Sequence, residues 1–458
     1  MENNVTWSLR LGFSGKQSAD IAKLGIRQFL ERSFSSEVDR AMPAFLQDDP
    51  KTMAELKAFR IEIKDLSSEK SKKALKKQIY DAAELKAWWI DKMLSEEFPL
   101  REKMTCFWHN HFVASSQKVK LNYWVYQHNM ILRDNAFGNF KDITKKMVTS
   151  NAIVRYLDNV DNRNGKINEN LSREMLELFT LGIGNYSEDD IKNGAKGLAG
   201  LAIGENHAVY RPVFEDNSTI TYFGKTGKFK ADELVDIVFE QPEVPYLLTR
   251  KILKWFIYDR PDEKLVRYYG DYFRSINFEI KPLLTKIFLE EYDKKTAGSK
   301  IKDPLVYIFQ LMDELNTDTR NSKLITFFLK QQGMDLFTQP NVKGWDGGNS
   351  WLTSQIYLQR QNVADLLCNG KNLNRQKMKM EVQNDQPISV KLKWNNTGTN
   401  RDIIEELKNR LLYNVDAATQ SDFEKILKYD FEPKSPGAEN AVLRLFNAMT
   451  KLPEYQLI

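Results

Sequence analysis

The chain has 458 residues, with 67 Lys and Arg against 62 Asp and Glu, which gives a formal net charge of +5. Such a small excess does not make a nucleic-acid-binding surface, and a composition of 42% hydrophobic and 28% charged residues excludes a disordered or fibrous chain. With 14 Pro and 22 Gly the chain has few helix breakers for its length. We therefore predict a mostly α fold, a multi-helix globular core with a small β-hairpin insertion.

The N-terminal half contains the clearest helical patterns. A turn at residues 12–15 precedes a short amphipathic pattern at 21–30, and residues 1–70 are expected to form an N-terminal helical docking segment. Residues 71–205 are expected to form a helical core, because apolar side chains recur with a period of 3.6 in each of its segments. The predicted helices of this core cover 71–95, 100–115, 121–135, 142–150 and 168–181.

The pattern changes after residue 205. Residues 206–230 are rich in β-branched and aromatic side chains followed by glycines, which predicts a β-hairpin insertion. A second helical layer is expected over 231–367, and C-terminal helices over 401–458. Residues 368–400 are expected to be a surface excursion with a strand-like centre at 388–394. Further predicted helices cover 231–258, 281–292, 304–315, 323–332, 401–412 and 421–429.

The chain shows neither a membrane span nor an export signal. No window approaches 18 consecutive apolar residues, so no membrane-spanning helix is expected. The N-terminus, MENNVTWSLRLGFSG, lacks the basic start and apolar centre of a signal peptide. We therefore expect the chain as written to be cytoplasmic.

Two of the four histidines lie in the string WHNHF at residues 108–112. On a helix, His109 and His111 point about 200° apart, so they cannot easily share one metal ion. His111 lies on the apolar face of its predicted helix, and His128 lies on the apolar face of the next one. A buried imidazole requires hydrogen-bond partners, which makes these residues candidates for a site.

The predicted helix 168–181 carries an acidic residue in its apolar stripe. Glu174 falls among leucines and a methionine, and Glu177 lies one turn away on the adjoining edge. A carboxylate inside a core costs several kcal/mol unless it is paired or bound to a metal. Its partner would be a histidine, an arginine such as Arg133 or Arg173, or a divalent cation. Two interpretations stay open: a catalytic or metal site, and a structural ion pair that fixes the helix register.

The segment 339–351 contains three glycines, one proline and two tryptophans, which predicts a tightly turned loop. The loop would line a sugar-binding pocket if Trp345 were a stacking ring with Asp346 and Asn341 as polar contacts. Alternatively, Trp345 and Trp351 pin a structural loop over the core, since buried indoles most often serve packing.

Six strings together resemble the bacterial DUF1800 family, and the similarity extends over essentially the whole chain. The resemblance supplies no reaction, because the family has no established activity. Relatives are often exported and often encoded beside a sulfatase-like protein, which implies extracellular polymer metabolism. The strings are WSLRLGFS (7–14), KMTCFWHNHF (103–112), GNFKDI (138–143), NENLSREMLELFTLGIGNYSEDDI (168–191), QPNVKGWDGG (339–348) and LPEYQL (452–457).

The sequence departs from the family pattern in three places. Many relatives carry a His-Asp pair where this chain has Glu215 and Asp216, and a T-G-W string where it has the residues Ala-Gly-Leu at 199–201. His128 stands where relatives commonly have Gln, which makes it a weaker candidate than His111. If the His-Asp pair of relatives binds metal, the resemblance implies that Asp216 is one ligand and that metal binds weakly or differently here.

Two functional hypotheses follow. The first is a metal-assisted, hydrolase-like enzyme acting on a glycan or related polymer, with Glu174 or Glu177 as general base and His111 as acid or ligand. In this hypothesis His109, His111, Glu174 and Asp216 are the candidate ligands of a divalent metal. The second is a non-catalytic scaffold that binds a surface polymer or a partner protein, such as the sulfatase-like protein associated with relatives.

Overall fold

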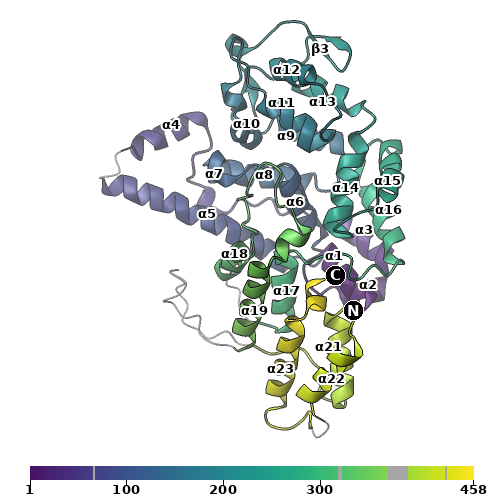
Figure 1. Ribbon diagram of the computed structural model, residues 1–458. Helices are drawn as coiled ribbons and strands as arrows, with labels where there is room; N and C mark the ends of the chain where they lie inside the picture. Colours follow the sequence, from purple (N-terminus) through teal and green to yellow (C-terminus); the bar gives the residue numbers. More distant parts are fainter. Residues whose placement is uncertain (65–67, 318–321, 370–389, 429–430) are drawn as a thin grey trace.

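The computed structural model describes residues 1–64, 68–317, 322–369, 390–428 and 431–458 (Figure 1). Helices dominate these ranges, and their strands form two short antiparallel pairs. The predicted mostly α fold with a small β-hairpin is therefore confirmed. No helix in the same ranges is long and apolar enough to cross a membrane.

The N-terminal segment contains more helices than predicted. The pattern at 21–30 is not one helix, because Gly25 adopts a φ of +75° and separates α2 from α3. Glycine adopts this left-handed conformation without a steric penalty, so it ends one helix and begins the next. The helices of this segment are α1 (Asn3–Leu11), α2 (Ser18–Leu24), α3 (Ile26–Phe34) and α4 (Met53–Glu62).

The helix that carries WHNHF lies at the centre of the molecule, beside α8 (Figure 1). This helix, α6, ends at His111 rather than at the predicted residue 115, because Phe112 leaves the helical conformation with φ −103° and ψ 73°. Figure 1 shows α4 and the first half of α5 projecting from the body. The helices are α5 (Glu69–Ser95), α6 (Leu100–His111), α7 (Ser116–Val119), α8 (Asn122–Asp134), α9 (Phe140–Val148) and α10 (Asn151–Tyr156).

The β insertion consists of two pairs rather than one hairpin. The predicted first strand, β2 (Val209–Tyr210), pairs with β1 (Leu201–Ala202), which lies before the expected insertion. The hairpin itself is β3 (Ile220–Tyr222) with β4 (Lys225–Gly227). These strands lie near α12 (Glu188–Gly197) at the top of Figure 1.

The second helical layer begins with a break that the sequence pattern did not show. The predicted helix 231–258 is two helices, α13 (Ala231–Phe239) and α14 (Val244–Phe256), and α15 and α19 were not predicted at all. Figure 1 shows α14, α15 and α16 stacked on one side of the molecule. The remaining helices are α15 (Glu263–Ser275), α16 (Ile280–Tyr292), α17 (Pro304–Glu314), α18 (Ser322–Gln331) and α19 (Ser354–Cys368).

The predicted strand-like centre at 388–394 falls partly outside the described residues. Its described part forms no strand, but the backbone N–H groups of Lys391 and Lys393 donate to the carbonyls of Leu315 and Glu314, both at 2.9 Å. An extended segment therefore lies against the end of α17. The C-terminal helices follow as α21 (Asn400–Leu411), α22 (Ala417–Ile426) and α23 (Ala438–Thr450).

One large apolar core extends from Trp7 to Tyr455 and joins both helical layers. The two chain ends meet beside it, where Val5 and Leu9 pack with Val306 and Ile458 in a small second cluster (Figure 1). Helix α6 is buried inside the large core, and its side chains contact α14 on one face and the 339–351 loop on another.

A candidate active-site cleft

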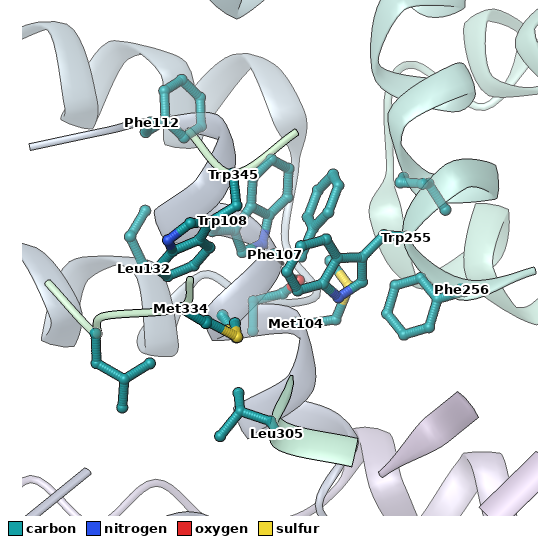
Figure 2. Close-up of a cluster of buried hydrophobic side chains, with 14 of the residues drawn as sticks. Met104, Phe107, Trp108, Phe112, Leu132, Trp255, Phe256, Leu305, Met334 and Trp345 are labelled. Carbon is teal, nitrogen blue, oxygen red and sulfur yellow. Dashed lines mark hydrogen bonds between the residues drawn. The ribbon is translucent and has the colours of Figure 1, made fainter. Parts of the chain in front are cut away.

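Nearly every side chain of α6 is buried, including both of its histidines. Figure 2 shows Met104, Phe107 and Trp108 of this helix packed with Trp255 of α14 and Trp345 of the 339–351 loop. The rings of Phe107 and Trp255 meet edge to face with centroids 6.0 Å apart. This apolar packing fixes the directions in which the polar side chains of WHNHF point.

His111 reaches the junction of α14 and the glutamate-rich segment. Its Nε2 lies 3.1 Å from the carbonyl oxygen of Phe179, and its Nδ1 lies 3.1 Å from Nζ of Lys251. A carbonyl can only accept, so Nε2 carries the proton and Nδ1 accepts from the Lys251 ammonium. Burial and the neighbouring Lys251 charge lower the pKa of His111 well below its usual value. The imidazole is therefore neutral at physiological pH.

Lys251 is the central polar residue of the site, and sequence analysis missed it. Its Nζ also donates to the carbonyl of Leu178 at 2.9 Å. Burial, together with the charge of Lys254, lowers the pKa of Lys251 to about 8. A signal was present in the sequence, because Lys251 interrupts the apolar stripe of α14 between Leu248 and Trp255.

The two carbonyls that hold this pair belong to a π-helical turn. Helix α11 (Asn170–Glu174) continues as a π-helix, η3 (Met175–Thr180), closed by a hydrogen bond from the Leu181 N–H to the Leu176 carbonyl at 2.9 Å. The Thr180 hydroxyl donates to the Met175 carbonyl at 2.6 Å. π-turns occur frequently at functional sites, because the wider turn changes the direction of side chains and carbonyls.

The π-turn also changes which residues of this segment are buried. Leu171, Met175 and Phe179 are buried, whereas Glu174 and Leu178 are only half-buried. Three members of the expected apolar stripe, Leu171, Met175 and Leu181, are buried, whereas Glu174, at the end of α11, is only half-buried. Partial burial, and next the charge of Glu177, still raise the pKa of Glu174.

Unlike Glu174, Glu102 of α6 is a fully buried carboxylate, and it lies between α6 and α8. Its two oxygens accept from Nε and Nη2 of Arg133, both at 2.8 Å, and one of them also accepts from Nε1 of Trp89 at 2.8 Å. Arg133 was a candidate partner of Glu174, and the structure pairs it with Glu102 instead. This buried pair is satisfied on both sides, which is typical of a structural ion pair.

His109 points away from His111, into a separate buried cluster. Nδ2 of Asn129 donates to Nε2 of His109 at 3.0 Å, and Nε2 of His128 donates to the carbonyl of Phe112 at 2.9 Å. Burial lowers the pKa of His128 to about 4 and that of His109 well below its usual value. These two histidines are neutral core residues.

Asn110, between the histidines, holds the 339–351 loop. Its Oδ1 accepts from the backbone N–H of Trp345 at 2.6 Å, and its Nδ2 donates to the Trp345 carbonyl at 3.2 Å. Gly344, with φ +83°, leaves room for this contact, since a Cβ there would lie 2.2 Å from Oδ1 of Asn110. Trp345 is 4% exposed, so its ring packs in the interior as expected for a loop pinned over the core, and it is not an open stacking surface. Asn341 and Asp346 are exposed.

The four residues predicted as metal ligands do not come together. Both ring nitrogens of His111 are engaged, His109 bonds Asn129, and Oδ1 of Asp216 accepts from the backbone of Ser218 at 2.9 Å. Within the described ranges, no three His, Cys, Asp or Glu side chains lie close enough together to hold a metal ion. His109, His111, Glu174 and Asp216 therefore do not form one ligand set among the described residues.

A cleft of about 460 Å³ opens between η3 and α14, and Glu177 and Lys251 both line it. A smaller hollow of about 150 Å³ continues from it toward α6 and the loop, and His111 lines that part. Lys251 and Lys343 line both spaces, so the cleft and the hollow adjoin each other. Oε2 of Glu177 accepts from the Tyr186 hydroxyl at 3.0 Å, which orients this carboxylate at the cleft wall.

The fold and the cleft define an α-helical protein with a lysine-containing site between two helical layers. The family model described as a protein of unknown function, DUF1800, matches residues 5–457. The chain therefore belongs to the DUF1800 family. No curated protein matches the chain, and no solved structure matches it.

Proposed function

We propose that the protein is a hydrolase-like enzyme that cleaves a glycan or related polymer in this cleft by general acid–base catalysis. The observation that supports the proposal most strongly is the Lys251–His111 pair, because the cleft contains a lysine with a pKa of about 8 held by a neutral imidazole. A general acid works best when its pKa is near the operating pH, and Lys251 meets this condition. The cleft volume of about 460 Å³ lies within the roughly 300–1,000 Å³ range of small-ligand sites, and the hollow adjoins it.

In this proposal Glu177 removes a proton from the attacking water, and the Lys251 ammonium gives a proton to the leaving oxygen. His111 is a positioning residue, since its Nδ1 holds Lys251 and its Nε2 is fixed on the π-turn. Glu174, whose pKa is raised by partial burial and by the charge of Glu177, lies one turn before Glu177 on the same segment.

The test uses the purified full chain and a panel of neutral and acidic polysaccharides, with release of reducing ends as the measurement. On a polysaccharide that the protein cleaves, Glu177→Gln is expected to lower kcat by about 10²- to 10⁴-fold, because a general base is lost. Lys251→Met is expected to remove the alkaline limb of the pH–rate profile near pH 8, where the ammonium loses its proton.

Glu243→Gln is the matched control, since Glu243 lines the same cleft but has no role in the proposed reaction. Equal losses in Glu177→Gln and Glu243→Gln would contradict the assignment of the base. Polymer binding without cleavage by the unchanged protein would favour the non-catalytic binding protein instead.

A further inference from the structure

The smaller hollow has an unusual distribution of charge. Four lysines line it, Lys251, Lys254, Lys300 and Lys343, whereas Asp346 is the one acidic residue in its lining. Lys300 is 4% exposed, so one of the four ammonium groups is deeply buried. Lys254 and Lys343 are exposed, so the cost of burying a charge falls on Lys300, and the lining as a whole carries four lysines against one carboxylate.

The ammonium groups of Lys254 and Lys300 carry more N–H donors than the hydrogen bonds that they make with the described residues. An ammonium carries three N–H donors, and among the residues that the structure describes Nζ of Lys254 donates to one acceptor, the backbone carbonyl of Asp346, at 2.8 Å. Nζ of Lys300 donates to the carbonyl of Lys254 at 3.0 Å and lies 3.7 Å from Oδ1 of Asp259. Among the described residues, the contact between Lys300 and Asp259 is the only ion pair that these four lysines make.

The indoles of the hollow add further donors. Trp255, Trp345 and Trp351 line it, and the Nε1 atoms of Trp255 and Trp345 are buried without a hydrogen-bond partner among the described residues. An indole N–H can only donate. Leaving such a group unpaired in the interior is unfavourable. Among the described residues around the hollow, two indole N–H donors therefore lack an acceptor, and Oδ1 of Asp259, the ion-pair partner of Lys300, is a buried acceptor without a hydrogen-bond donor.

We infer that this hollow binds an oxyanion, a carboxylate or a sulfate or phosphate ester, carried by the polymer that occupies the adjoining cleft. The lysines would supply charge-assisted hydrogen bonds, and the aromatic walls would exclude water around them. The inference rests on the proposed function, because it names the class of polymer that the cleft accepts. The substrate is then an acidic polymer rather than a neutral one.

The test titrates sodium sulfate and sodium glucuronate into the full chain at constant ionic strength, with calorimetry and tryptophan fluorescence as the measurements. Glucose is the neutral probe. Lys254→Gln/Lys343→Gln removes two exposed charges of the hollow, and affinity for the anions is expected to fall by about tenfold or more. Lys300→Met is the second variant, and it should lower the affinity in the same direction.

Lys192→Gln/Lys330→Gln removes the same charge from exposed positions outside the hollow, and it should leave the affinity unchanged. Binding of sulfate alone, glucuronate alone or both supports the inference and identifies the oxyanion. Absence of binding by either anion, or equal losses in the two double variants, would overturn it. Glu177→Gln should keep the anion affinity, so failure of the catalytic proposal is distinguishable from failure of this one.

Discussion

At the residue scale, burial makes His128 a pH-sensitive element of stability. The folded protein holds His128 with a pKa of about 4, below its usual 6.5, because burial disfavours the charged ring. Between these values the unfolded chain binds a proton that the folded chain does not. Stability is therefore lost as the pH falls from 6.5 to 4, by about 3 kcal/mol for this residue.

His128→Gln should flatten that part of the stability profile, because glutamine does not titrate and its amide can still donate to the Phe112 carbonyl. Urea unfolding at several pH values between 4 and 7 measures the change. His207→Gln is the control, since His207 is exposed and should leave the profile unchanged. An identical acid loss in the wild type and His128→Gln would contradict the assignment.

At the element scale, one contact decides where the 339–351 loop sits on α6. Gly344 has a φ of +83°, and a Cβ there would meet Oδ1 of Asn110 at 2.2 Å and its backbone carbonyl at 2.6 Å. Gly344→Ala should therefore destabilise the protein by about 3 kcal/mol or more, through backbone strain and a clash with main-chain atoms. Urea unfolding followed by tryptophan fluorescence tests this, because Trp345 follows directly.

Gly184→Ala is the matched comparison. Gly184 has a similar φ of +89° but no heavy atom within 4 Å of the added Cβ, so only the strain of about 1–2 kcal/mol applies. Similar losses in the two variants would show that the close approach of loop and helix has no role in stability.

At the scale of the whole molecule, a buried arginine connects three distant parts of the chain. Arg360 of α19 donates to Oε1 of Gln332 at 3.1 Å, to Oε1 of Gln456 at 3.1 Å and to the Lys302 carbonyl at 2.8 Å. Its guanidinium also lies over the ring of Tyr307, 4.7 Å from the centroid. The C-terminal segment is therefore attached to α17, α18 and α19 together.

Arg360→Met should lower the free energy of unfolding by about 3 kcal/mol or more, because it leaves three buried acceptors without this donor. Urea unfolding of the full chain provides the measurement, and limited proteolysis should show earlier cleavage near the C-terminus. Arg401→Met, at an exposed position of α21, should change the stability by less than about 0.5 kcal/mol. A loss confined to Arg401→Met would contradict this role of Arg360.

Much of the fold was predictable because it depends on local patterns. The period of apolar residues predicted α5, α8, α16 and α17 to within a few residues. Breaks in the pattern were less predictable: Gly25 splits one predicted helix, and β2 pairs with a strand from before the expected insertion. Strand pairing and helix breaks depend on contacts between segments, which a sequence window does not contain.

The sequence alone determined the helical class, the family membership, and the opposite directions of His109 and His111, because composition, motif strings and helical geometry require no knowledge of distant contacts. The tertiary structure decided which charged groups meet. It paired Glu102 with Arg133, left Glu174 half-buried at the end of α11, and brought Lys251 to His111 from 140 residues away. Burial and hydrogen bonding depend on the packing of all layers at once, and these two properties set the proton affinities of the proposed site.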